Sequence, residues 1–218
     1  MKQLSRIWSI DEKHVYAMGS KLRNVSAESF RVLSEVFATD GLDVFYIEGR
    51  IKGVDAETFE ACDSGIYCNG PGFNTISHKG YGRDKNSVWF CNSASGKPCI
   101  VKRANRDTFV SIDGAYGRDH KNVFRERYAL NGADAKTWHK LSKHFSKDRE
   151  KVFYLSRIIK EADPQSFMTL WPNNSFWAKD KLNFYYQDQI STKEAYFKDY
   201  REYHQEMLDS EKVLQDRL

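Results

Sequence analysis

The sequence predicts a β-rich repeat protein built of tandem β-hairpins, each closed by a short helical turn, with a C-terminal helix. Three observations predict this fold. A signature of an aspartate, polar residues, an apolar residue and aromatics recurs six times. A capped segment that carries an aromatic residue stands between most copies. The last residues of the chain contain neither proline nor glycine and place apolar side chains near helical spacing.

The recurring signature sets the period of the chain. A repeat of about 30 residues is one supersecondary unit that cannot bury its apolar face alone, so successive units are expected to stack. We therefore predict one repeat domain over residues 1–218. Its repeats begin near the aspartates of the six copies: Asp11, Asp40, Asp84, Asp119, Asp148 and Asp180.

The second copy shows the predicted hairpin most clearly. Val44, Phe45 and Tyr46 form a β-branched and aromatic run that favours a strand. The segment 48–50 contains glycine and predicts the turn, and the segment 51–54 predicts the returning strand.

The helical turn is predicted directly after each hairpin. Asp55 is a good N-cap, because its carboxylate can accept hydrogen bonds from the free amides of the next turn. Phe59 follows on the side expected to face the hairpin. Aromatic residues close the corresponding segments elsewhere: Phe30, Phe109, Trp138 and Phe167.

Two segments interrupt or end the repeats. The step between Asp40 and Asp84 is the longest, and it holds a turn-rich central insert at 62–80. Insertions in repeat arrays map to loops on one face, which is often the binding face. The segment 193–218 predicts a helix that caps the last hairpin, as the end of a solenoid requires.

Composition bounds the class of protein. Apolar residues make up 40% of the 218 residues and aromatics 14%, and a disordered chain lacks such an aromatic content. The net charge of +4 is too small and too evenly spread to indicate nucleic-acid binding by itself.

No apolar stretch reaches the length of a membrane span, and the N-terminus has no apolar segment typical of a signal peptide. We expect a cytoplasmic protein as the sequence is written, or a periplasmic or envelope protein if an upstream leader has been removed.

The four cysteines, Cys62, Cys68, Cys91 and Cys99, match no zinc-binding spacing. In the cytosol they are expected to be reduced and partly buried. In an exported protein, a disulfide between Cys62 and Cys68 or between Cys91 and Cys99 becomes the favoured alternative.

The repeated aspartates suggest two interpretations. A calcium ladder needs several oxygen ligands at alternate positions, but a basic residue follows the aspartate in several copies and would repel a cation. We favour aspartates that pin the turn entering each hairpin. The histidines do not form a helical metal pair, since His139 and His144 lie five residues apart. We expect no metal, no cofactor and no catalytic residues.

The most basic tract runs from Lys97 to Lys121. It contains cations together with Trp89, Phe90 and Tyr116 close by, a combination that can bind nucleic acid. The favoured alternative is a solvated hairpin edge that positive charge protects from pairing with other strands. A docking surface for an acidic protein patch is the third alternative.

The signature resembles the DKNYY repeat family of bacterial proteins. The resemblance rests on Asp84-Lys85-Asn86, Val152-Phe153-Tyr154, and the capped segments 55–59 and 163–167, and it spans about residues 11–190. It implies proteins that are mostly uncharacterised, either of the cell envelope or encoded near toxins, some of which look like immunity proteins. The family defines no catalytic residues, so none is transferred.

We therefore predict a non-catalytic protein-binding repeat protein whose partner is a cognate toxin. The alternative is a structural or adhesive envelope protein, and a nucleic-acid ligand is less favoured. The partner-binding residues are expected among the exposed aromatics and cations of the central region: Tyr67, Phe73, Lys79, Tyr81, Arg83, Lys102 and Arg103.

Overall fold

The computed structural model describes residues 1–68, 74–76, 78–92, 96–113, 115–170, 176–202 and 205. The chain divides into two compact units, Met1–Lys136 and Thr137–Leu218. Within the described residues, no helix is both long enough and apolar enough to cross a membrane.

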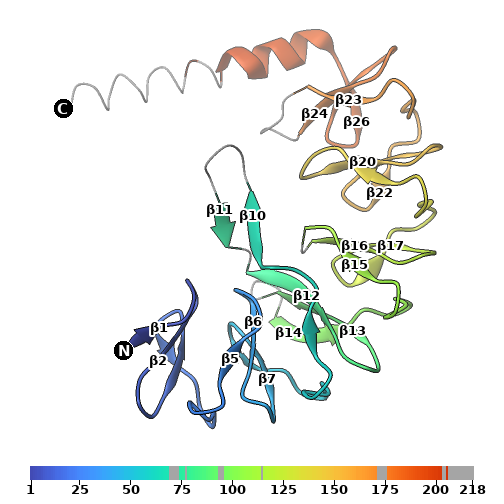
Figure 1. Ribbon diagram of the computed structural model, residues 1–218. Helices are drawn as coiled ribbons and strands as arrows, with labels where there is room; N and C mark the ends of the chain where they lie inside the picture. Colours follow the sequence, from blue (N-terminus) through green and yellow to red (C-terminus); the bar gives the residue numbers. More distant parts are fainter. Residues whose placement is uncertain are drawn as a thin grey trace, which may run out of the picture. The chain divides into compact units, whose positions relative to one another are not determined.

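The described part of the chain contains six small antiparallel sheets of four strands each, which confirms the β-rich fold (Figure 1). In three of the four sheets of the first unit, the strands are neighbours in chain order. The first of these sheets has β1 (Lys2–Gln3), β2 (Trp8–Ile10), β3 (Val15–Ala17) and β4 (Ser20–Lys21). The second has β5 (Arg31–Val32), β6 (Phe37–Thr39), β7 (Val44–Tyr46) and β8 (Gly49–Arg50). The fourth has β15 (Val110–Ser111), β16 (Tyr116–Arg118), β17 (Val123–Arg125) and β18 (Tyr128–Ala129).

The third sheet departs from the repeat. Its order is β14-β13-β12-β9, because a separate two-stranded hairpin, β10–β11, lies between β9 and β12 in the chain. This hairpin falls inside the segment 62–80 that the sequence sets apart as an insert. The strands are β9 (Glu60–Ala61), β10 (Ile66–Cys68), β11 (Asn74–Ile76), β12 (Lys79–Arg83), β13 (Val88–Asn92) and β14 (Gly96–Ile100).

The second unit contains two further sheets and a helix. Residues 193–202 are helical, which confirms the C-terminal helix over that range. The predicted remainder, 203–218, lies outside the described residues apart from Gln205. The fifth sheet has β19 (His139–Lys140), β20 (Phe145–Lys147), β21 (Val152–Tyr154) and β22 (Arg157–Ile158). The sixth has β23 (Met168–Thr169), β24 (Trp177–Lys179), β25 (Phe184–Tyr186) and β26 (Gln189–Ser191).

The predicted hairpin of the second copy is partly wrong. β7 forms as predicted, but it pairs with β6 on one side and with β8 on the other, so the aspartate turn lies in the middle of a four-stranded sheet. The segment 48–50 was predicted as the turn. Tyr46 pairs with Gly49, so the loop is only Ile47 and Glu48, and a loop of two residues suffices for a hairpin. The predicted returning strand at 51–54 is a connection out of the sheet.

The helical turns after each hairpin are not confirmed. The connecting segments are hydrogen-bonded turns. One of them has a helix-like hydrogen bond, from the N–H of Phe167 to the carbonyl of Asp163 at 3.0 Å.

In the connections that lie within one unit, the aromatic residue packs between the two sheets that the connection joins. In the first unit, Phe109 lies 5.0 Å from Tyr81 of the third sheet and 5.9 Å from Phe124 of the fourth, measured between ring centroids. In the second unit, Phe167 lies 5.4 Å from Phe145 and 5.5 Å from Tyr185 in the same way. These rings are almost fully buried, so a single aromatic joins the cores of two small sheets.

Two of these connecting aromatics lie directly on glycine. A Cβ atom added to Gly82 would come within 2.1 Å of the Phe59 ring, and one added to Gly117 within 2.3 Å of the Phe109 ring. The positions of Gly82 in β12 and Gly117 in β16 therefore have no room for a side chain.

Candidate functional site

Each of the six repeated aspartates holds the turn that follows it. One carboxylate oxygen accepts hydrogen bonds from the backbone N–H groups two and three residues later, at 2.6–3.0 Å in every copy. This is the local side-chain-to-backbone bonding of an Asx turn. The prediction that the aspartates pin these turns is confirmed.

The second carboxylate oxygen reaches the connection from the preceding sheet. In four copies it accepts a hydrogen bond from the backbone N–H of the residue that caps that connection. The pairs are Ser26 with Asp40 at 3.4 Å, Asp55 with Asp84 at 3.1 Å, Asn105 with Asp119 at 2.8 Å, and Asp163 with Asp180 at 2.9 Å. Each of these aspartates therefore joins two successive repeats.

The lysine of the signature neutralises the cap of the preceding connection. Lys85 Nζ lies 2.7 Å from the Asp55 carboxylate, and Lys181 Nζ lies 3.2 Å from that of Asp163. The hydrogen bond from Lys85 is the largest cause of the lowered pKa of Asp55. In the first connection the cap is Ser26 and the residue after Asp40 is Gly41. The carboxylate of the cap and the lysine that would pair with it are therefore both absent there.

Hydrogen bonding also lowers the pKa of the aspartates themselves. Burial acts to raise the pKa of Asp119, but backbone N–H groups from Asn105, Lys121 and Asn122 outweigh it, and the net pKa is lowered. The pKa of Asp180 is lowered in the same balance. These carboxylates are ionised and engaged in internal hydrogen bonds.

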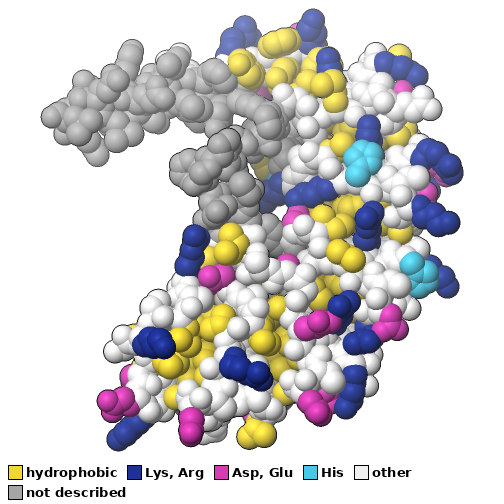
Figure 2. Space-filling model, viewed as in Figure 1, with side chains coloured by type: hydrophobic (Ala, Val, Ile, Leu, Met, Phe, Trp, Pro, Cys, Tyr) yellow, Lys and Arg dark blue, Asp and Glu magenta, His cyan; other side chains and the backbone are white. Residues whose placement is uncertain are grey.

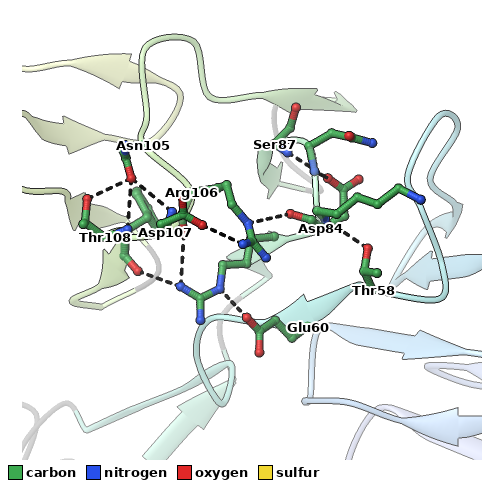
Figure 3. Close-up of polar contacts among 12 residues, drawn as sticks. Thr58, Glu60, Asp84, Ser87, Asn105, Arg106, Asp107 and Thr108 are labelled. Carbon is green, nitrogen blue, oxygen red and sulfur yellow. Dashed lines mark hydrogen bonds and ion pairs between the residues drawn. The ribbon is translucent and has the colours of Figure 1, made fainter.

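The connection between the third and fourth sheets holds further cations within the fold (Figure 3). Arg83 bonds to the Glu60 carboxylate and donates to the carbonyls of Arg106 at 3.2 Å and Phe109 at 3.4 Å. Arg106 donates from Nε to the Asp84 carbonyl at 3.1 Å. Both arginines therefore stabilise the junction.

Other cations near this junction lack such partners. Lys and Arg side chains are spread over the face drawn in Figure 2 among acidic ones, so the overall charge singles out no surface. We define the cationic edge as Lys102, Arg103 and Lys121, which are exposed and form no ion pair within the described ranges. Arg118 is also exposed, just before the aspartate turn.

The aromatics near the basic tract are buried. Trp89 is 6% exposed, and Phe90 and Tyr116 are each 1% exposed. They form the core of their sheets and present no ring face on which a base could stack. The basic tract therefore lacks the stacking platform that the nucleic-acid alternative requires of these three residues.

The signature residues correspond to a known repeat family. Residues 8–157 match the DKNYY family, which is more than half of the chain. The chain belongs to the DKNYY family. No curated protein and no solved structure matches it. In this DKNYY protein, the aspartate and lysine of the family name are the residues that pin turns and neutralise caps.

The predicted partner-binding residues of the DKNYY protein fall in different environments. Tyr81 is fully buried, and its hydroxyl donates to the Glu126 carbonyl at 2.7 Å, so the expectation that it is exposed is wrong. Lys79 pairs with Glu126 at 3.1 Å, and Arg83 is held at the junction described above. Tyr81 is buried because its ring packs against Phe90 and Phe109, at 5.0 Å from each between ring centroids.

The other predicted residues are placed only in part. Lys102 and Arg103 belong to the cationic edge. Tyr67 lies on β10, where its backbone pairs with Thr75. Phe73 lies outside the described residues. The structure thus brings together only Lys102 and Arg103, and adds Lys121, which the sequence placed in the basic tract without assigning it a binding role.

The three thiols that the structure describes have no activated character. Cys62, Cys91 and Cys99 are free, so neither of the two alternative disulfides is present. Burial raises the pKa of Cys62 to about 12, and it raises the pKa of Cys91 well above its usual value. A nucleophilic cysteine needs a lowered pKa, so these thiols serve packing. Among the residues the structure describes, no three His, Cys, Asp or Glu side chains form a metal-binding group.

Proposed function

We propose that this DKNYY protein binds another protein, does no chemistry, and acts as a bacterial immunity protein that neutralises a cognate toxin. The observation that supports the proposal is the division of its charged groups. The repeated aspartates and several basic residues are engaged within the fold, whereas the cationic edge is exposed and without ion partners in the described ranges.

The engagement of the carboxylates within the fold and the exposure of the cationic edge favour a binding function over a catalytic one. A catalytic carboxylate or thiol needs a pKa suited to proton transfer or attack. Several aspartates of the repeat have lowered pKa values because they accept internal hydrogen bonds, and the described thiols have raised ones. A rigid scaffold with a surplus of charge on one edge is typical of inhibitors that cover a partner by complementary electrostatics.

The test expresses the full chain together with the toxin-like protein encoded beside it in the source genome. We expect restored growth and a complex that stays intact during size-exclusion chromatography. The comparison variant is Asp84→Ala, which removes a buried carboxylate that joins two repeats. Because this weakens the scaffold, it should lower the protection of the cells against the toxin.

A genome with no toxin gene beside this one would contradict the immunity proposal. So would a toxin that neither binds the chain nor loses its effect on growth. Recovery of envelope components alone in a pull-down would instead support the structural or adhesive alternative.

A further inference from the structure

We propose that the cationic edge docks on an acidic surface of the partner protein, with Arg103 as its central contact. The inference rests on the proposed protein-binding function and names the chemistry of the partner. Its evidence comes from the placement of two turns, the backbone conformation of Arg103 and the charges around it.

Two turns bring the three cations of the edge together. Lys102 and Arg103 lie in the turn after β14, and Lys121 lies in the turn between β16 and β17. The side-chain amide of Asn122 donates to the Arg103 carbonyl at 3.5 Å. The backbone N–H of Asn105 donates to Asp119 at 2.8 Å, which fixes the same two turns a second time.

The backbone at Arg103 has the left-handed conformation, with φ of 72°. The turn is closed by a hydrogen bond from the Ala104 N–H to the Val101 carbonyl at 3.3 Å. A positive φ at the third residue of such a turn favours glycine or asparagine. The equivalent turns of the first unit follow this rule, with Asn24 at 56°, Gly53 at 84° and Gly132 at 73°.

In the first unit, arginine is thus the exception at a position that the other turns fill with glycine or asparagine. The equivalent residue of the second unit is Glu161, in the turn that the Ala162 N–H closes onto the Ile159 carbonyl. A non-glycine residue in the left-handed conformation is disfavoured, because its Cβ atom comes too close to the following carbonyl oxygen. Residues held in unfavourable backbone conformations concentrate at functional sites. The side chain of Arg103 makes no ion pair in the described part of the molecule, so nothing described within the fold offsets that cost. Contact with a partner would offset it, although the conformation alone is shared by other residues such as Met18 and Leu155.

The junction also lacks the carboxylate that neutralises other junctions. Asp55 and Asp163 cap their connections and pair with lysine, but the cap before the fourth sheet is Asn105. The nearby Asp107 pairs with Arg106 at 2.6 Å. The residue after Asp119 is His120 and not lysine, so the lysine that pairs with the cap elsewhere is absent together with the carboxylate. The positive charge of this edge therefore comes from Lys102, Arg103 and Lys121.

An acidic protein surface fits this positive charge better than nucleic acid does. Arginine binds carboxylates through two parallel hydrogen bonds, which gives specificity as well as attraction. Single-stranded nucleic acid also needs exposed ring faces on which successive bases stack. Trp89, Phe90 and Tyr116 are buried, and the exposed Tyr128 ring of the fourth sheet has the Arg127 guanidinium 5.5 Å from its centroid. We therefore assign the edge to aspartate and glutamate side chains of a partner protein.

The test uses the full chain and a fluorescein-labelled peptide of 12 alternating aspartate and glycine residues, with binding followed by fluorescence polarisation. We expect Arg103→Gly to weaken binding about tenfold, the loss of one charge-assisted hydrogen bond. Lys121→Ala should also weaken it. The control is Lys52→Ala, which removes the same charge from the equivalent place of Lys102 in the second connection and should change affinity less than twofold.

The variant Arg103→Gly also distinguishes a loss of binding from a loss of folding. Arg103→Gly relieves the backbone, so its melting temperature should equal or exceed that of the original protein while its affinity falls. Equal peptide affinity of Arg103→Gly and Lys52→Ala would overturn the inference. Tighter binding of an oligothymidine of 12 nucleotides than of the peptide would overturn the choice of partner class.

Different results would contradict the docking edge and the immunity function. If Arg103→Gly with Lys121→Ala neutralises the toxin as well as the original chain does, the docking edge is wrong and the immunity function stands. If the peptide responds to these variants but no toxin is neutralised, the immunity function is wrong and the acidic-surface site stands.

Discussion

At the scale of single residues, one aspartate combines the roles that hold a repeat in place. Asp84 is completely buried and accepts four hydrogen bonds, from the backbone of Asn86, Ser87 and Asp55 and from the Trp89 ring N–H. Its own turn, the preceding connection and a core aromatic thus meet at one carboxylate. A buried carboxylate is stable only when its oxygens are satisfied in this way.

Removing this carboxylate should destabilise the fold strongly. Asp84→Ala leaves the buried Trp89 ring N–H without an acceptor, which costs about 1–3 kcal/mol, and it removes the acceptor of the half-buried Asp55 N–H and of two turn amides. We expect the free energy of unfolding to fall by about 3 kcal/mol in urea denaturation. Asp107→Ala is the control, because that side chain is 70% exposed and should cost less than about 0.5 kcal/mol. Equal effects of the two variants would show that the buried carboxylate is dispensable.

A substitution in the tight turn between β3 and β4 should stabilise the protein. Met18 and Gly19 both have positive φ, 50° and 78°, and Met18 is 56% exposed. Asparagine followed by glycine is the preferred pair for a turn with positive φ at both positions. Met18→Asn should therefore raise the free energy of unfolding by about 0.5–1 kcal/mol. Met18→Val, which tolerates positive φ poorly, is the opposite control and should lower it; a loss of stability in Met18→Asn would contradict this account.

At the scale of elements, the aromatic connection decides how closely two sheets can lie. The Phe109 ring occupies the space above Gly117, and it touches rings of both neighbouring sheets. The strand β16 therefore uses glycine for close approach, at a position where strand propensity would favour a branched residue.

A methyl group at Gly117 should disrupt this contact. Gly117→Ala places Cβ 2.3 Å from the Phe109 ring, and overpacking of this kind costs about 1–3 kcal/mol. Denaturant unfolding measures the loss. Val110→Ala, at an exposed position of the adjacent strand β15, should cost less than about 0.5 kcal/mol. A Gly117→Ala protein as stable as the original would mean that the ring can shift away freely.

Some elements of this fold can be predicted from the sequence and others cannot. The aspartate turn and the connecting aromatic were predictable, because each depends on side chains within a few residues of its backbone partners. The pairing of β8 with β7 was not, since Gly49–Arg50 is too short to show alternation. The bond from Asn105 to Asp119 joins residues 14 apart, so only the folded chain reveals it. Tyr81 was misplaced because an aromatic beside basic residues looks the same in sequence whether it faces the core or the solvent.

At the scale of the whole molecule, repeated and unrepeated charges have different uses. Charges that recur with the period, such as those of Asp55 with Lys85 and Asp163 with Lys181, are paired between consecutive repeats. The charge of Arg103 does not recur, and it occupies a backbone position of glycine type. In a repeat protein, departures from the period are therefore the places to look for recognition.

The same distribution of carboxylates predicts how the molecule responds to acid. The pKa values of Asp55, Asp119, Asp163 and Asp180 are lowered in the folded protein, mainly by the hydrogen bonds they accept. Groups of this kind stabilise the fold above their unfolded pKa of about 3.9, and the stabilisation is lost as the pH falls through the folded value. Asp11 belongs to the same group, since the hydrogen bond from Tyr16 lowers its pKa. Burial raises the pKa of Asp63, which acts in the opposite sense, but it is one group against five.

We therefore expect the free energy of unfolding to hold nearly constant from about pH 7 to pH 5 and to fall steeply below about pH 4. Urea denaturation at a series of pH values measures it. The control replaces the pair by Asp55→Asn with Lys85→Met, which removes one titrating carboxylate and should make the acid slope shallower. A slope that is unchanged in this variant, or a stability that persists to pH 2, would show that the carboxylates between repeats do not govern the acid response.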